Sequence, residues 1–212
     1  MRVLLTALLL LLGATPAYAG PGQEPIGGGS VLFSPTARCT AAFAARDAMG
    51  QDHLVAGPGC GSAGTHLFSG DTVLVGPVTA TQTNGFITVV RVTNTPAWTV
   101  VPWIPVGATQ HVISGATETP IGGSVCLLDR SLGQRCGFIT AKNLTINYAD
   151  GAITGVTRTN ICMQQQSTAI AFVSGAQAQG VPIGGSSCST TGVSYFLPIR
   201  PILAANGLTV LA

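Results

Sequence analysis

Charged residues are scarce in this sequence. Only 8% of its 212 residues are Asp, Glu, Lys or Arg, and nine Lys and Arg stand against seven Asp and Glu. This gives no basis for a nucleic-acid partner, because binding to phosphates needs clustered cations. Disordered chains combine high charge with low hydropathy, whereas the mean hydropathy here is +0.48. With 28 glycines, the balance favours a compact, turn-rich, all-β protein.

The sequence also lacks an apolar run long enough to span a bilayer, which takes about 20 residues. The shorter run over 3–12 follows Arg2 and precedes Ala17-Tyr18-Ala19, a small-x-small cleavage signature. This order predicts a secretory signal peptide over 1–19, cleaved near Ala19. We therefore expect a secreted protein, extracellular or in the cell envelope, with no membrane span in its mature form.

No Cys-x-x-Cys pair occurs, and His53, His66 and His111 share no ligand spacing, so we predict neither a metal site nor a cofactor. Cysteines behind an export signal instead predict disulfides, although their number alone selects no pairing. The six cysteines are Cys39, Cys60, Cys126, Cys136, Cys162 and Cys188.

Short runs of Val, Ile and Thr, broken by Gly, Asn and Asp, predict antiparallel strands joined by tight turns. Asn84-Gly85 is a hairpin-turn signal, and 201–206 is predicted as a short helix that ends before Gly207. The strands expected from this pattern include 40–45, 53–56, 72–75, 86–92 and 194–197.

The segment from Gly133 to Cys188 resembles part of a known protein family. Its phrases include GQRCGFITAKNLTINYADGAITGVTRTNICM and VPIGGSSC. It resembles the C-terminal half of the secreted bacterial alpha-lytic protease and streptogrisin family, which belongs to the chymotrypsin-like (trypsin-like) serine proteases. The run over 26–33 is similar to the start of mature streptogrisins. The resemblance implies an all-β fold of two antiparallel Greek-key β-barrels with a short C-terminal helix. It also implies the disulfides Cys39–Cys60, Cys126–Cys136 and Cys162–Cys188.

The domain organisation follows from the same resemblance. After the signal peptide we expect a flexible leader over 20–29 and an N-terminal β-barrel over 30–98. A proline-rich inter-barrel linker is expected over 99–115, and the C-terminal β-barrel with its helix over 116–212.

Two members of the family's catalytic triad have no counterpart here. The family carries its histidine in Thr-Ala-Gly-His-Cys, whereas this chain reads VAGPGC over 55–60, which puts Pro58 or Gly59 at the histidine position. The position of the family's aspartate falls on Gly85 or Phe86. Neither an imidazole base nor the carboxylate that orients it is therefore predicted.

The nucleophile region differs as well. The family's Gly-Asp-Ser-Gly-Gly turn aligns with QSTAI over 166–170, so Thr168 matches the serine and Gln166 the first glycine. Replacing these glycines changes the turn that supplies the oxyanion hole. Ile183 stands where active relatives have a serine that lines the specificity pocket.

We therefore predict a pseudoprotease, a homologue without an intact triad that works as a non-catalytic binding or envelope protein. Its expected partner is a peptide or protein in the inter-barrel cleft, bound by strand addition to a monomer. One alternative is an active serine-type endopeptidase that uses Ser167 or Thr168 with a displaced histidine such as His53 or His66. Another is a structural scaffold without a cleft ligand.

Two arginines lie in the loop between Cys126 and Cys136. Arg130 and Arg135 are predicted to be solvated there, because isolated charged side chains on a loop are mostly exposed.

Overall fold

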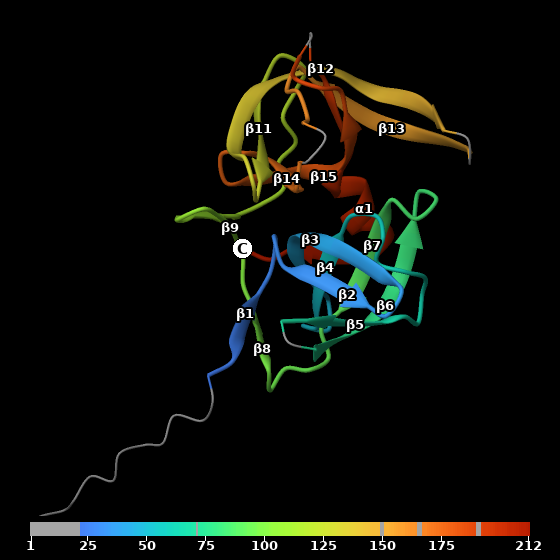
Figure 1. Cartoon of the computed structure of the whole chain (residues 1–212), viewed down its shortest axis with the longest axis vertical. Helices are drawn as coiled ribbons and strands as arrows, with labels where there is room; N and C mark the ends of the chain where they lie inside the picture. Colours follow the sequence, from blue (N-terminus) through green and yellow to red (C-terminus); the bar gives the residue numbers. More distant parts are fainter. Residues whose placement is uncertain (1–21, 71, 149–150, 165–166, 190–191) are drawn as a thin grey trace, which may run out of the picture.

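Two β-barrels lie one above the other along the molecule (Figure 1). The computed structural model describes residues 22–212 except 71, 149–150, 165–166 and 190–191. The predicted signal peptide and Gln166 lie outside the described residues. The predicted fold of two antiparallel barrels with a short C-terminal helix is confirmed.

The N-terminal barrel is a sheet in the order β17-β3-β2-β5-β6-β7-β4, closed by pairing of β3 with β4. Its Val- and Ala-rich strands β3, β4 and β7 are buried over consecutive residues, because one face meets the interior of this barrel and the other meets the core shared with the C-terminal barrel. The strands are β2 (Val31–Ser34), β3 (Ala37–Asp47), β4 (Asp52–Ala56), β5 (His66–Ser69), β6 (Val73–Gln82), β7 (Ile87–Arg91) and β17 (Leu208–Val210). The predicted strands of this half fall on β3, β4, β6 and β7.

The C-terminal barrel closes in the order β11-β12-β13-β16-β15-β14. Its longest hairpin, β12 with β13, extends sideways from the barrel (Figure 1). The strands are β11 (Ser124–Asp129), β12 (Gly133–Tyr148), β13 (Gly151–Thr159), β14 (Ala169–Ser174), β15 (Gln177–Gly185) and β16 (Ser194–Pro198).

The segments outside the barrels carry short strands. β1 (Glu24–Ile26), in the stretch predicted as a leader, pairs in parallel with β8 (Trp98–Val100). The stretch predicted as a linker contains the hairpin of β9 (Trp103–Val106) and β10 (Thr109–Val112). The boundaries assigned from the sequence otherwise stay predictions.

The end of the chain returns to the N-terminal barrel. Helix α1 (Ile199–Ala205) buries Ile199, Ile202 and Leu203, a spacing that places one apolar stripe against the core. Gly207, at φ 63°, then turns the chain into β17, which pairs with β3. Residues 208–210, assigned by sequence to the C-terminal barrel, therefore belong to the N-terminal sheet.

One hydrophobic cluster crosses from barrel to barrel and includes Phe43, Val55, Leu128, Ile170 and Val181. Burial of each large apolar side chain contributes about 1.5–3 kcal/mol, so this shared core fixes how the two barrels dock. The three disulfides have the predicted pairing. Within the described part of the chain, no helix combines the length and the apolar character that a membrane crossing requires.

Candidate active site

A cavity of about 390 Å³ opens between the two barrels. Its N-terminal wall includes Arg38, Thr40, Gly57 and Pro58, and its C-terminal wall includes Met163, Ser167, Thr168, Val181, Ile183 and Gly184. Among these and the other described lining residues, Arg38 is the one charged side chain. We call this cavity the cleft.

A buried carboxylate lies behind the C-terminal wall. Along β11, Val125 and Leu127 pack into the core of the C-terminal barrel, whereas Leu128 packs into the cluster shared by both barrels. A β-bulge between Leu128 and Asp129 interrupts this alternation. Bulges re-aim side chains, and the fully buried side chain of Asp129 bonds to the residues that precede β14.

Two hydroxyl groups donate to this carboxylate. Ser167 donates its Oγ–H to Asp129 Oδ2, and Thr168 Oγ1 lies 3.1 Å from Asp129 Oδ1. The backbone N–H of Ser131 donates both to Asp129 Oδ1 at 2.9 Å and to Thr168 Oγ1 at 3.0 Å. Ser131 Oγ adds a further hydrogen bond to Thr168 Oγ1, at 2.7 Å. Thr168 is exposed and lines the cleft, and its hydroxyl is oriented by these contacts with Asp129 and Ser131.

These bonds decide the charge of Asp129. Burial acts to raise the pKa of the carboxyl, but hydrogen bonds from Ser167, Ser131, Leu132 and Thr168 together outweigh burial and hold the pKa below its ordinary value. Donors that bond the charged form stabilise it. Asp129 is therefore a carboxylate at neutral pH.

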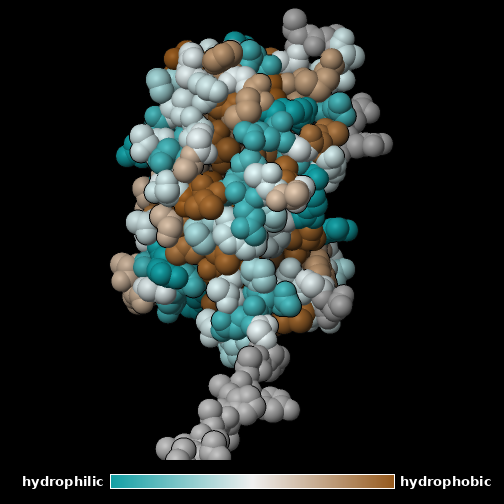
Figure 2. All heavy atoms as spheres, turned by 90° about the vertical axis from the view of Figure 1, so that its left-hand side faces the viewer, coloured by the Kyte–Doolittle hydropathy of each residue, from teal (hydrophilic) through white to brown (hydrophobic). Residues whose placement is uncertain are grey.

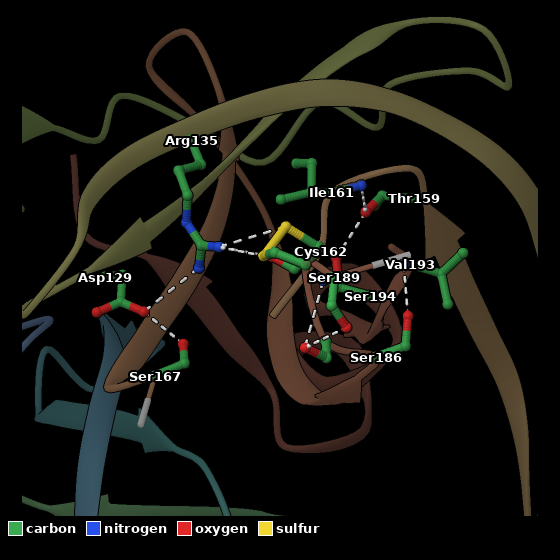
Figure 3. Close-up of a disulfide and its surroundings, with 12 residues drawn as sticks. Asp129, Arg135, Thr159, Ile161, Cys162, Ser167, Ser186, Ser189, Val193 and Ser194 are labelled. Atoms are coloured by element: carbon green, nitrogen blue, oxygen red, sulfur yellow. Dashed lines mark hydrogen bonds and ion pairs between the residues drawn. A yellow bond between two sulfur atoms is a disulfide. The ribbon is translucent and has the colours of Figure 1, made fainter. Parts of the chain in front are cut away.

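Arg135 links the carboxylate to a disulfide (Figure 3). Its Nη2 lies 3.5 Å from Asp129 Oδ2, and its Nη1 donates to the carbonyl oxygen of Cys162 at 2.7 Å. The side chain of Arg135 is 23% exposed. The prediction that Arg135 is solvated is therefore wrong, because the buried charge of Asp129 draws the guanidinium inward. Arg130 remains exposed, although it also donates to the carbonyl oxygen of Gly29.

The chain is 33% identical over 186 residues to streptogrisin-C of Streptomyces griseus, covering 87% of this chain and 40% of that protein. It is 32% identical over 188 residues to glutamyl endopeptidase 2 of Streptomyces griseus, covering 86% of this chain and 98% of the relative. Among solved structures, Thermobifida fusca protease A matches with a TM-score of 0.76 at 33% identity, covering 89% of this chain and 100% of that chain. The chain belongs to the chymotrypsin-like serine proteases.

Within that family the relatives include streptogrisins and an alpha-lytic protease homologue, N4, which matches with a TM-score of 0.74 at 32% identity over 88% of this chain and 99% of that one. No family model matches the chain. The chain spans 40% of streptogrisin-C and 56% of serine protease 1 of Streptomyces fradiae, about half the length of these curated relatives.

The comparisons overturn the main function predicted from the sequence. The relatives that match most of this chain are named as a streptogrisin, an endopeptidase and proteases. The prediction of a non-catalytic binding or envelope protein is therefore wrong, and the pseudoprotease interpretation is not retained. A serine-type endopeptidase, the first alternative, fits these relatives better.

The structure brings three of the predicted site residues together in this family member. Pro58, Thr168 and Ile183 all line the cleft. Gly59 follows Pro58 in this wall and has φ 87°. A Cβ atom at Gly59 would lie only 2.7 Å from the carbonyl oxygen of Arg38, so the position favours glycine. The assignment of Pro58 or Gly59 to the histidine position stays a prediction, as do the roles of Thr168 and Ile183.

Gly85 and Phe86 lie elsewhere. Gly85 (φ 83°) belongs to the turn between β6 and β7, which confirms the predicted hairpin. Phe86 packs against the ring of Tyr148 at the end of β12, with ring centroids 5.2 Å apart. Neither residue is among the described residues that line the cleft.

The histidines named as displaced bases have other surroundings. Buried His53 lies with Nε2 3.3 Å from Asp47 Oδ2, and His66 is exposed on β5. Neither makes a hydrogen bond to Ser167 or Thr168 in the described part of the chain. In that part, no group of three His, Cys, Asp or Glu residues is arranged to hold a metal ion.

Sequence reasoning missed Asp129 and Ser131. Asp129 ends an otherwise apolar strand, SVCLLD, and a carboxylate at the end of a buried strand is an available signal for a functional or paired group. Ser131 carried no signal, because two of its three contacts in this network come from its backbone N–H, which every residue except proline has.

Proposed function

We propose that this protein is a secreted serine-type endopeptidase that hydrolyses peptide bonds in the cleft, with Thr168 as nucleophile and Asp129 as proton acceptor. One observation carries the proposal: Thr168, an exposed residue on the cleft wall, donates a hydrogen bond of 3.1 Å from its hydroxyl to the buried carboxylate of Asp129. Membership of a family whose relatives are named as proteases supports the same reaction class.

The proposed reaction has two steps, as in other acyl transfers. Thr168 Oγ1 attacks the carbonyl carbon of the substrate while its proton passes to Asp129 Oδ1. The amine product leaves with that proton, and the acyl group stays on Thr168 as an ester. Water then attacks the ester, which releases the carboxylic acid product and restores the Thr168 hydroxyl. One water is consumed for each bond broken.

The hydrogen bonds of Ser131 orient the nucleophile. Its N–H and Oγ both contact Thr168 Oγ1, so they direct the Thr168 O–H proton toward Asp129 Oδ1. Ser167 occupies the other carboxylate oxygen and thereby positions Asp129. Fixed geometry of this kind replaces part of the activation that a stronger base supplies.

We expect slow turnover. Proton transfer is most efficient when the pKa of the base lies near the working pH, and the pKa of Asp129 is held below the ordinary carboxyl value. Relative to an imidazole base the rate is expected to fall by about 10²–10⁴, the range that general acid–base catalysis contributes.

Export is part of the proposal. Three disulfides are typical of oxidising compartments outside the cytoplasm. In this proposal the signal sequence predicted over 1–19 directs export and is cleaved near Ala19.

Labelling with a fluorophosphonate probe tests the nucleophile. The mature, oxidised protein is compared with Thr168→Ala, Ser167→Ala and Thr145→Ala, the last an exposed threonine on β12. Streptogrisin-C is the positive control. We expect covalent labelling that Thr168→Ala abolishes and Thr145→Ala leaves unchanged. No labelling under conditions where streptogrisin-C reacts would overturn the proposal, and loss in Ser167→Ala alone would reassign the nucleophile.

The pH profile of casein cleavage tests the base. An imidazole with an ordinary pKa of about 6.5 loses activity on acidification to pH 5. Because the pKa of Asp129 is lowered, we expect cleavage to persist at pH 5 and to be lost in Asp129→Asn. A profile that falls with an apparent pKa near about 6.5 would point to a histidine and contradict the assignment of Asp129.

A further inference from the structure

Arg38 stands where the cleft meets a second hollow. It lines the cleft and also a cavity of about 450 Å³ that Val31, Phe33, Ser69 and Gly70 complete. Arg38 is exposed, and its guanidinium makes no ion pair with the described residues. The path out of the cleft therefore passes an uncompensated positive charge.

Two aromatic rings continue this path. Arg38 on β3 pairs directly with Phe33 on β2, and Phe33 pairs with Phe68 on β5. Directly paired residues point to the same face of a sheet, so the three side chains form a row across three strands. Phe33 and Phe68 are half-buried, with ring centroids 6.5 Å apart. They line a third cavity, of about 250 Å³, together with Ser34, Pro35 and Thr72.

Neighbouring hollows in this row share lining residues. The cleft and the second cavity share Arg38, and the second and third share Phe33. Neighbouring strands are about 4.8 Å apart, and an extended peptide presents same-side residues about 6.6 Å apart. A peptide that leaves the cleft along this row thus places one of its side chains beside Arg38. The side chain two residues farther along the peptide then lies on the rings of Phe33 and Phe68.

We propose that this row is an extended substrate subsite that selects peptides carrying an acidic residue and, two positions farther from the cleft, an aromatic one. The inference rests on the proposed function, since its ligand is the peptide substrate. A carboxylate pairs with the planar guanidinium through two parallel hydrogen bonds, and an aromatic side chain fits the tilted Phe33 and Phe68 rings. A lysine at the first position would be repelled.

Other charged residues give a basis for choosing the control. Arg200, on α1, is also exposed but lines a different hollow, near the C-terminus. The face shown in Figure 2 has hydrophobic residues in separate patches between hydrophilic ones.

Fluorescence anisotropy with labelled peptides tests the subsite. The peptides carry Glu-Ala-Phe, Gln-Ala-Phe, Lys-Ala-Phe or Glu-Ala-Ala in an otherwise alanine and glycine sequence. Binding is measured to the mature protein and to its Thr168→Ala form, which does not turn over, each with and without Arg38→Gln or Arg200→Gln. We expect Glu-Ala-Phe to bind about three- to tenfold more tightly than Gln-Ala-Phe, with this preference lost in Arg38→Gln and kept in Arg200→Gln.

The outcomes separate this inference from the proposed function. Equal affinity for the Glu and Gln peptides, a preference that survives Arg38→Gln, or no binding of any peptide overturns the subsite. If the probe still labels Thr168 in that case, the endopeptidase proposal stands alone. Peptide preference without labelling leaves the subsite in place and removes the catalytic proposal.

Discussion

The two walls of the cleft differ in where their polar groups come from. On the C-terminal side, Asp129 and Ser131 meet Ser167 and Thr168 through the pairing of β11 with β14. On the N-terminal side, Gly57 and Pro58 have no polar side chain. Arg38 is the one charged side chain among the described residues that line the cleft. One barrel holds the candidate chemistry, whereas the other contributes shape and one cation.

This asymmetry has a physical consequence. A site built within one barrel is positioned by strand pairing and stays intact as long as that barrel folds. A triad shared between barrels instead depends on their docking. We therefore expect substitutions in the N-terminal wall to change peptide binding without changing the carboxylate network, and substitutions in the C-terminal wall to change stability as well.

The largest expected effect comes from Asp129→Asn. The substitution removes a fully buried charge and leaves the partly buried Arg135 without its ion-pair partner. Breaking a buried pair by removing one member costs about 3–5 kcal/mol. Urea unfolding with the disulfides intact measures the loss. Coincident fluorescence and circular dichroism transitions check that unfolding is two-state.

Asp52→Asn in the N-terminal barrel is the matched control. Asp52 pairs with Arg46 at 2.8 Å, with side-chain exposures of 22% and 47%. Exposed pairs contribute about 0–1 kcal/mol. Equal losses for the two variants would mean that the Asp129 network is no more buried in solution than a surface pair, and the contrast between the walls would disappear.

The pH dependence of stability sharpens the same contrast. The folded-state pKa of Asp129 lies below its ordinary value, so its stabilising contribution is complete above about pH 4 and is lost as pH falls through the folded-state pKa. We expect the free energy of unfolding to fall more steeply below about pH 4 in the wild type than in Asp129→Asn. Urea midpoints at several pH values measure both slopes.

Some acid sensitivity should remain in that variant. The pKa of Asp47 is also lowered, chiefly by the backbone N–H of Gln51, and this contribution has the same sign. Identical slopes in the wild type and in Asp129→Asn would show that the carboxyl of Asp129 titrates alike in the folded and unfolded chains, contrary to its hydrogen bonding.

Much of the fold could be predicted from sequence, and little of the candidate site. The strands at 53–56 and 86–92, the Asn84-Gly85 turn and the helix near 201–206 follow local rules of alternation and turn chemistry. The resemblance supplied the disulfide pairing. Each of these features is either local in the sequence or implied by the resemblance.

The Asp129 network is neither local nor repeated in a motif. It depends on a bulge at the end of β11 and on a contact between residues 129 and 167. Sequence periodicity predicts which face a residue occupies but not where a bulge re-aims it. For the same reason β17 was assigned to the wrong barrel, since its pairing with β3 joins residues at opposite ends of the chain.

The smallest expected effect tests whether a contact away from the cleft also couples the two barrels. Phe86 precedes β7 in the N-terminal barrel, and its ring meets Tyr148 at the end of β12 in the C-terminal barrel, at 5.2 Å and 40°. Aromatic pairs contribute about 0.5–1.5 kcal/mol beyond burial. A double-mutant cycle of Phe86→Ala and Tyr148→Ala should give a coupling energy in this range.

Phe138→Ala is the control partner, because Phe138 is 53% exposed and should combine additively with Phe86→Ala. Additivity in both cycles would mean that the hairpin of β12 and β13 does not hold the barrels together, which would leave the shared core around Phe43 and Val181 as what fixes the cleft.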